Sequence, residues 1–148
     1  LGKNSQTIDY NIVADHFGKK TESLITVNGA LTDSAKKVFR GTIDFKKGSA
    51  DSVGSENETV LMLGDDVVNK TVPLILCAEE NVEGTHGATI GELDADTMFY
   101  FESRGIDRET AEKIMAYAAV ERLIHMAEDS EFAAVAEKAM GIKTDTEE

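Results

Sequence analysis

His86 is the residue whose type and neighbours point most directly to chemistry in this chain of 148 residues. It lies in the segment EENVEGTHGATIGELDADTMFYFESRG, which is rich in acidic side chains and glycines. The glutamates around it are Glu79, Glu80, Glu83 and Glu92. A histidine near carboxylates can bind Fe²⁺ or Zn²⁺, or can transfer a proton. The competing interpretation is structural, with His86 packing the end of a β region against the first helix.

Cys77 is the single cysteine, so the chain cannot form an intramolecular disulfide. It follows the apolar run VPLIL and is predicted to be buried as a small hydrophobic residue. Iron–sulfur clusters are typically held by several thiolates, so Cys77 cannot hold one without other ligands. A Gly-Lys-Ser/Thr sequence is absent, which argues against ATP binding by this chain.

The overall charge and hydropathy exclude several classes of partner. The net charge is −13, and nucleic acids are bound mainly by lysines and arginines that neutralise phosphates, so no nucleic-acid partner is expected. No apolar run approaches the roughly 18–20 residues of a membrane span, and no signal peptide is visible. These features predict a cytoplasmic protein that does not contact membranes. The start at Leu1, close to strand-like sequence, is interpreted as a piece of a longer protein.

The first ninety or so residues read as short strands separated by polar turns. The apolar runs are 8–14, 23–27, 37–45, 60–63 and 72–78. In the third run, apolar and polar side chains alternate with period two, as in a strand with one buried face. Asn28-Gly29 is interpreted as a turn, and DSAKK, within residues 32–38, as a single helical turn. This pattern is compatible with a sandwich, a barrel or an irregular β-solenoid.

From Asp94 onward the sequence predicts helices. Asp94 or Asp96 can cap a first helix, which Gly105 would end. Asp107 is placed to cap a longer helix whose apolar residues recur at helical spacing. A third helix is predicted from Asp129 or Ser130 to Met140, and the final KTDTEE is expected to be frayed.

Several motifs together resemble the SufB/SufD family of iron–sulfur cluster assembly proteins, and the D-type subunit in particular. The most specific are HGATIGELD and the following MFYFESRGID. VFRGTI, the GSA turn and the LMLG…TVP spacing also match, so the similarity extends over roughly residues 8–125. The resemblance implies a mainly β fold with C-terminal α structure. Rungs of a right-handed parallel β-helix (β-solenoid) would occupy residues 1–93, and a small helical domain would occupy 94–148.

The resemblance also implies a non-catalytic scaffold subunit of the SUF assembly complex. Its C-terminal helices would dock a SufC-type ABC ATPase, and its β-helix would pair with a SufB-type subunit or an identical one. His86 matches the histidine expected at that interface, as a metal or cluster ligand. No cofactor is expected on this chain alone, whereas iron or an iron–sulfur cluster is expected in the full complex. The expected partner-binding residues are Met98, Phe99, Tyr100, Phe101 and Arg104.

The MFYF run places four large side chains in one helical turn, more than one face can bury. We therefore expect Phe99 to face inward, and Tyr100 or Met98 to face outward.

Two departures from the family bear on cluster binding. Gly84 stands where many D-type members have a cysteine, and Val67 stands where the B-type partner has one.

The alternative function is a β-helix enzyme that acts on polysaccharide through paired carboxylates. Such enzymes need two carboxyl groups roughly 5–10 Å apart. The candidate groups are Asp65-Asp66 and Glu79-Glu80. Adjacent carboxylates in turns are more often solvated loop charges, which makes this the second interpretation.

Overall fold

The structure, a computed structural model, describes residues 1–140, with the exception of the His125 side chain. Six strands precede three helices in the described part of the chain. The strands are β1 (Thr7–His16), β2 (Glu22–Thr32), β3 (Lys36–Phe45), β4 (Ser52–Leu63), β5 (Val68–Cys77) and β6 (Val82–Glu92). The helices are α1 (Ala95–Glu102), α2 (Arg108–Met126) and α3 (Ser130–Met140). The expected fraying of KTDTEE lies outside the described residues.

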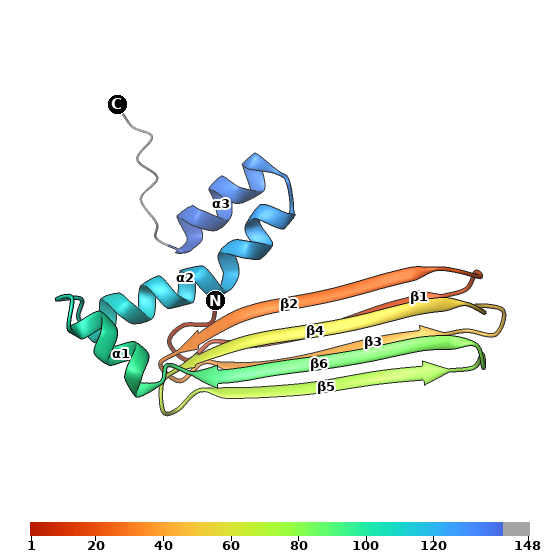
Figure 1. Cartoon of the computed structure of the whole chain (residues 1–148), viewed down its shortest axis with the longest axis horizontal. Helices are drawn as coiled ribbons and strands as arrows, with labels where there is room; N and C mark the ends of the chain where they lie inside the picture. The colour runs from red at the N-terminus through yellow and green to blue at the C-terminus, as the bar shows by residue number, and fades with distance from the viewer. Residues whose placement is uncertain (141–148) are drawn as a thin grey trace.

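The strands form two parallel sheets that face each other. Odd-numbered strands make one sheet, in the order β1-β3-β5, and even-numbered strands make the other, in the order β2-β4-β6 (Figure 1). The chain therefore changes sheet at every turn and returns to the same sheet after about 30 residues. Thr7 pairs with Lys36, for example, and Lys36 pairs with Val68. Each circuit of the chain thus adds one strand to each sheet.

Side-chain alternation directs one face of each strand into the space between the sheets. In β3, Phe39, Ile43 and Phe45 are fully buried, whereas Arg40 is exposed. This is the period-two pattern that the sequence predicts. Burial of each such apolar side chain contributes about 1.5–3 kcal/mol, so this face holds the sheets together. Ile25 of β2 packs against the same cluster from the opposite sheet.

The helices pack on the outer face of the even-numbered sheet. Ala116 of α2 is buried against Ala30 of β2 and Leu63 of β4. α2 lies across the end of this sheet, and the chain then turns so that α3 runs back beside α2 (Figure 1). The described helices are all gathered at the end of the strands where β6 runs into α1 (Figure 1).

The predicted helix caps are confirmed. The Asp94 carboxylate accepts a hydrogen bond from the Thr97 N–H at 2.6 Å, and Asp107 accepts one from the Thr110 N–H at 2.8 Å. Each bond satisfies an N–H that has no partner inside the helix. Gly105, in the short connection between α1 and α2, has φ +79°, a conformation that favours glycine.

Two local predictions are wrong. Asn28-Gly29 lies inside β2 rather than in a turn, because β2 pairs with β4 along its whole length. DSAKK forms a turn and the start of β3, with no helix. The sequence also gives no indication of β6, a glycine-rich strand whose residues are mostly exposed.

The predicted order of a mainly β region followed by helices is confirmed, and the change of structure falls between Glu92 and Ala95. The sheets are parallel, as in a β-helix, but they remain two separate sheets that are not closed. The right-handed β-helix and the division into two domains stay predictions.

A charged pair lies inside the stack of sheets. Lys37 of β3 donates a hydrogen bond to Glu58 of β4, and their side chains are 4% and 0% exposed. Lys37 also donates to Asn69 at 3.3 Å, and the Thr71 hydroxyl donates to Glu58. The Glu58 carboxylate therefore has its charge and its hydrogen-bonding capacity matched by residues of two other strands.

Removing one partner of this pair leaves a buried charge without compensation. We expect Lys37→Met to lower the free energy of unfolding by about 3–5 kcal/mol. The double variant Lys37→Met with Glu58→Leu should recover most of that loss, because neither charge is then buried. Urea unfolding of the three proteins measures both effects. Equal loss in the single and double variants would contradict this account.

The exposed pair of Arg40 and Asp9 provides the matched control. These side chains are 45% and 51% exposed, so solvent screens their attraction. Arg40→Met should leave the unfolding midpoint nearly unchanged.

Candidate functional site at the open edge

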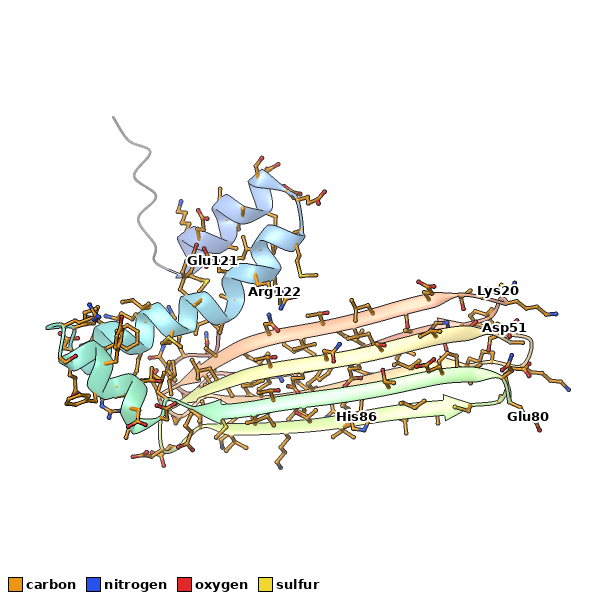
Figure 2. The ribbon with its side chains drawn as sticks, viewed as in Figure 1. Lys20, Asp51, Glu80, His86, Glu121 and Arg122 are labelled. Atoms are coloured by element: carbon orange, nitrogen blue, oxygen red, sulfur yellow. The ribbon has the colours of Figure 1, made fainter. Side chains whose placement is uncertain are left out.

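His86 lies near the middle of β6, an outer strand of its sheet (Figure 2). Its register partner in β4 is Glu56. Register partners on neighbouring strands place their side chains on the same face, and Glu56 is a core-facing residue that is 2% exposed. His86 therefore occupies a core-facing position, but it is itself exposed because no described strand lies beyond β6.

Glu56 occupies space that a glycine provides. A Cβ atom added to Gly41 of β3 would overlap the Glu56 carboxylate. The carboxylate thus reaches across the core toward the opposite sheet. Among the described residues Glu56 makes no hydrogen bond, in contrast to Glu58, which is fully paired two positions along the same strand.

Burial in the core raises the pKa of the Glu56 carboxyl above its ordinary value. The charge of His86 acts in the opposite direction, and the neighbouring Glu58 carboxylate adds to the rise. The charged form of Glu56 is therefore held in the folded chain at a cost.

The four glutamates that the sequence places near His86 do not surround it. Glu79 lies in the turn before β6, where it accepts hydrogen bonds from the N–H groups of Gly48 and Glu80 at 3.0 and 3.1 Å. These two bonds lower the pKa of the Glu79 carboxyl. Figure 2 shows Glu80 at the turn, well away from His86.

The remaining two glutamates are also separated from His86. Glu83 is an odd-numbered residue of β6 and so lies on the opposite face of that strand. Glu92 lies at the far end of β6, next to α1. Residues 1–140 contain no group of three or more His, Cys, Asp or Glu side chains placed to hold a metal ion.

Sequence reasoning missed Glu56, although it is the carboxylate that the strand register brings next to His86. The two residues are 30 positions apart, and only the pairing of β4 with β6 relates them. The sequence offers no signal for this, because the valines of the segment SVGSENETV, Val53 and Val60, lie on opposite faces of β4.

Cys77 is exposed, which contradicts the prediction that it is buried. It is the last residue of β5, the outer strand of its sheet. Its register partner is the buried Phe45 of β3, so Cys77 occupies a core-facing position that no further described strand covers. A Cβ atom on Gly84 would lie 2.8 Å from Ile75, so Gly84 and Ile75 face each other across the core. Cys77 lies two residues beyond Ile75, and His86 lies two residues beyond Gly84 in the opposite direction. Cys77 and His86 are therefore about 13 Å apart along the strands. The structure does not bring them together.

The two positions that lack the family's cysteines have apolar surroundings. The inner side of Gly84 is filled by Ile75 and by Phe45, which would lie 3.2 Å from an added Cβ atom. Val67 is buried in an apolar cluster with Leu31 and Val60.

His16 is a structural residue. It is 3% exposed and contacts the Thr21 and Ser23 hydroxyls at 2.6 and 2.8 Å. Its ring packs on Phe45 with 4.7 Å between centroids.

The aromatic run of α1 is largely exposed, but not in the predicted arrangement. Met98 is 4% exposed and faces inward, whereas Phe99 and Tyr100 are 72% and 54% exposed. The prediction that Phe99 faces inward is therefore wrong, and the outward position of Tyr100 is confirmed. The Arg104 guanidinium lies over the Tyr100 ring, 4.4 Å from its centroid. Phe101 is half-buried and meets Tyr100 edge to face.

The raised pKa of Glu56 gives a pH-dependent stability. Below the ordinary glutamate pKa, Glu56 is protonated in the folded and the unfolded chain, so its burial carries no charge penalty. As the pH rises, the unfolded chain loses this proton first, and the folded state becomes progressively less favoured until the raised pKa is passed.

Glu56→Gln removes that penalty. We expect it to raise the melting temperature at pH 7, where the unchanged chain carries the cost of the buried charge. At about pH 3.5 the gain should vanish. Circular dichroism melts with a chelator present measure this, and Glu83→Gln is the exposed control. A gain of equal size at both pH values would contradict the burial explanation.

Comparison with known proteins identifies the family of this chain. Residues 1–119 match the family model described as SUF system FeS cluster assembly, SufBD core domain. The iron–sulfur cluster assembly protein SufD of Bacillus subtilis is 32% identical over 117 residues, which are 79% of this chain and 27% of that protein. SufD of Escherichia coli is 30% identical over 88 residues, which are 60% of this chain and 21% of that protein.

A more distant relative matches almost the whole chain. The iron–sulfur cluster assembly SufBD family protein ABCI8 of Arabidopsis thaliana, a chloroplastic protein, is 27% identical over 143 residues, 97% of this chain and 26% of that protein. The chain thus spans about a quarter of the length of these relatives. In the part that the structure describes, no helix is long and apolar enough to cross a membrane. From the family match and the relatives together, the chain belongs to the SufB/SufD family of the SUF iron–sulfur cluster assembly system.

Proposed function

We propose that this chain forms part of a non-catalytic scaffold on which the SUF system assembles iron–sulfur clusters. In this role the strands are rungs of a right-handed parallel β-helix, and the open edge formed by β5 and β6 pairs with a SufB-type subunit or a second copy. The helices α1 and α2 dock a SufC-type ABC ATPase, which supplies the ATP hydrolysis. The observation that carries the proposal is an exposed histidine, His86, on the outer strand of a chain that belongs to this family.

The open edge suits pairing with another protein. β5 and β6 are the outer strands of their sheets, so each presents a row of backbone groups that no described strand covers. The outward face of β5 adds exposed apolar side chains, which are Val72, Leu74 and Leu76. A partner strand at this edge would come to lie beside His86.

The exposed side chains of α1 suit a protein partner. Phe99, Tyr100 and Arg104 are all exposed, and aromatic and arginine side chains dominate the binding energy of many interfaces. Their exposure, on α1 and just after its end, leaves them free to enter a pocket on an ATPase subunit.

The polysaccharide enzyme has no comparable support. The turn that contains Asp65-Asp66 and the turn that contains Glu79-Glu80 are separated by the whole of β5, which spans about 30 Å. That distance is several times the separation that a glycosidase needs. Glu79 has a lowered pKa and is held by backbone N–H groups, so it is poorly suited to act as a general acid.

An acidic hollow also argues against acidic glycans. This hollow, of about 480 Å³, lies where α2 meets the ends of the strands. Its charged lining consists of Asp33, Asp65, Asp66, Glu92, Glu112 and Arg108. The excess of carboxylates would repel an acidic sugar chain.

ATPase docking is tested by charge substitution in α1. We expect Phe99→Asp and Tyr100→Asp each to weaken binding to the ABC ATPase of the same system by about 30-fold or more, as for hot-spot residues. Isothermal titration calorimetry measures this. Phe132→Asp, which changes an exposed aromatic residue of α3, is the matched control and should bind normally. Unchanged binding by both α1 variants would remove this helix from the proposed interface.

The assembly role of His86 is tested separately from its contribution to the fold. His86→Ala should sharply reduce cluster formation on the complex with the partner subunit, while the melting temperature changes little because the side chain is exposed. His16→Ala should instead destabilise the chain, since it removes a buried ring and its hydrogen bonds. If His86→Ala unfolds the chain, its role is packing.

A further inference from the structure

Beneath His86, the core contains a carboxylate that the proposed scaffold role does not use. Glu56 is 2% exposed and makes no hydrogen bond with the described residues. A buried carboxylate without a partner costs free energy, and buried charges in proteins are usually paired or bound to metal ions. Glu58, two residues away on the same face of β4, is paired with Lys37 and Thr71. Of the two core-facing carboxylates of β4, Glu56 is therefore the one that is available to bind a ligand.

The opposite sheet makes room for this carboxylate. A Cβ atom on Gly41 would overlap the carboxylate of Glu56 and would lie 2.9 Å from the Phe39 ring. Any side chain at this position would push the carboxyl group away from where it lies. The register partner of Gly41 in β5 is Pro73, so no hydrogen-bonding side chain stands beside it at the open edge.

The position of His86 brings a second ligand type to the same place. His86 is the register partner of Glu56 and lies on the same face, one strand nearer the open edge. A carboxylate and an imidazole are both ligands of divalent transition metals such as Fe²⁺ and Zn²⁺. The other inward charges nearby, Lys37 and Glu58, are paired with each other, so Lys37 does not pair with Glu56.

We propose that Glu56 and His86 are the inner and outer ligands of a divalent-cation site at the open edge of the core. The inference rests on the proposed assembly function, in which iron is the substrate, and it adds the residue that meets the ion from inside the stack. Since residues 1–140 offer no third side chain for such a site, water or a partner chain completes the coordination. The bound cation offsets the cost of burying the Glu56 charge, so binding stabilises the fold.

Cobalt(II) is the probe for this site, because its visible absorption reports coordination and calorimetry reports affinity. The 148-residue chain should bind one Co²⁺, and its melting temperature should rise with Co²⁺ concentration. Glu56→Gln, which keeps the size of the side chain, should weaken binding by about tenfold or more, and His86→Gln should do the same. Glu83→Gln removes a carboxylate from the other face of the same strand, and it should bind Co²⁺ as the unchanged chain does.

A second variant tests the role of the space at Gly41. Gly41→Ala keeps both ligands but displaces the Glu56 carboxyl, so it should also weaken Co²⁺ binding. Circular dichroism verifies that each variant is folded, and Glu56→Asp, which keeps the charge but shortens its reach, provides a further test if another variant unfolds. Glu56→Asp should bind more weakly than the unchanged chain.

Two results would overturn the inference. One is the absence of Co²⁺ binding by the unchanged chain, and the other is equal Co²⁺ affinity in the unchanged chain and Glu56→Gln.

ATPase binding separates this inference from the proposed function. Normal ATPase binding with unaltered Co²⁺ affinity in Glu56→Gln would refute the cation site alone. If the unchanged chain binds Co²⁺ but not the ATPase, and Glu56→Gln weakens Co²⁺ binding, the scaffold role alone would be refuted.

Discussion

In-register pairing of parallel strands is the constraint on which the rest of this structure depends. Because the chain returns to each sheet after about 30 residues, every core-facing side chain stands above the core-facing side chain of the previous circuit. Ala14, Ile43 and Ile75 form one such column. A shift of one residue in any strand would turn its core face to solvent. The same register relates His86 to Glu56.

Two glutamates on one strand show how this architecture treats buried charge. Glu58 is matched by a lysine and a hydroxyl from the opposite sheet, and it serves the fold. Glu56 is given space by Gly41 but no hydrogen-bonding partner among the described residues. The two carboxylates differ in their neighbouring side chains. Glu58 is paired within the fold, whereas Glu56 is available to bind a ligand.

The sequence predicts those features that depend on neighbours along the chain. The caps at Asp94 and Asp107 and the alternation in β3 are local patterns, and all three are confirmed. β6 was missed because glycine and polar residues have low strand propensity, and its pairing with β4 supplies the stability that its own residues do not. The partner of His86 was missed for a related reason, since Glu56 is distant in sequence. The exposure of Cys77 follows from the position of β5 at a sheet edge, which composition does not reveal.

A disulfide test of the register would examine the central claim most directly. Asn57 and Gly87 are outward-facing register partners next to Glu56 and His86. With Cys77 replaced by serine, the double variant Asn57→Cys with Gly87→Cys should form a disulfide on mild oxidation, because neighbouring strands lie about 5 Å apart. Asn57→Cys with Glu83→Cys, four residues out of register, should not. Cross-linking of the second pair but not the first would show that β4 and β6 pair differently, and His86 would then not lie beside Glu56.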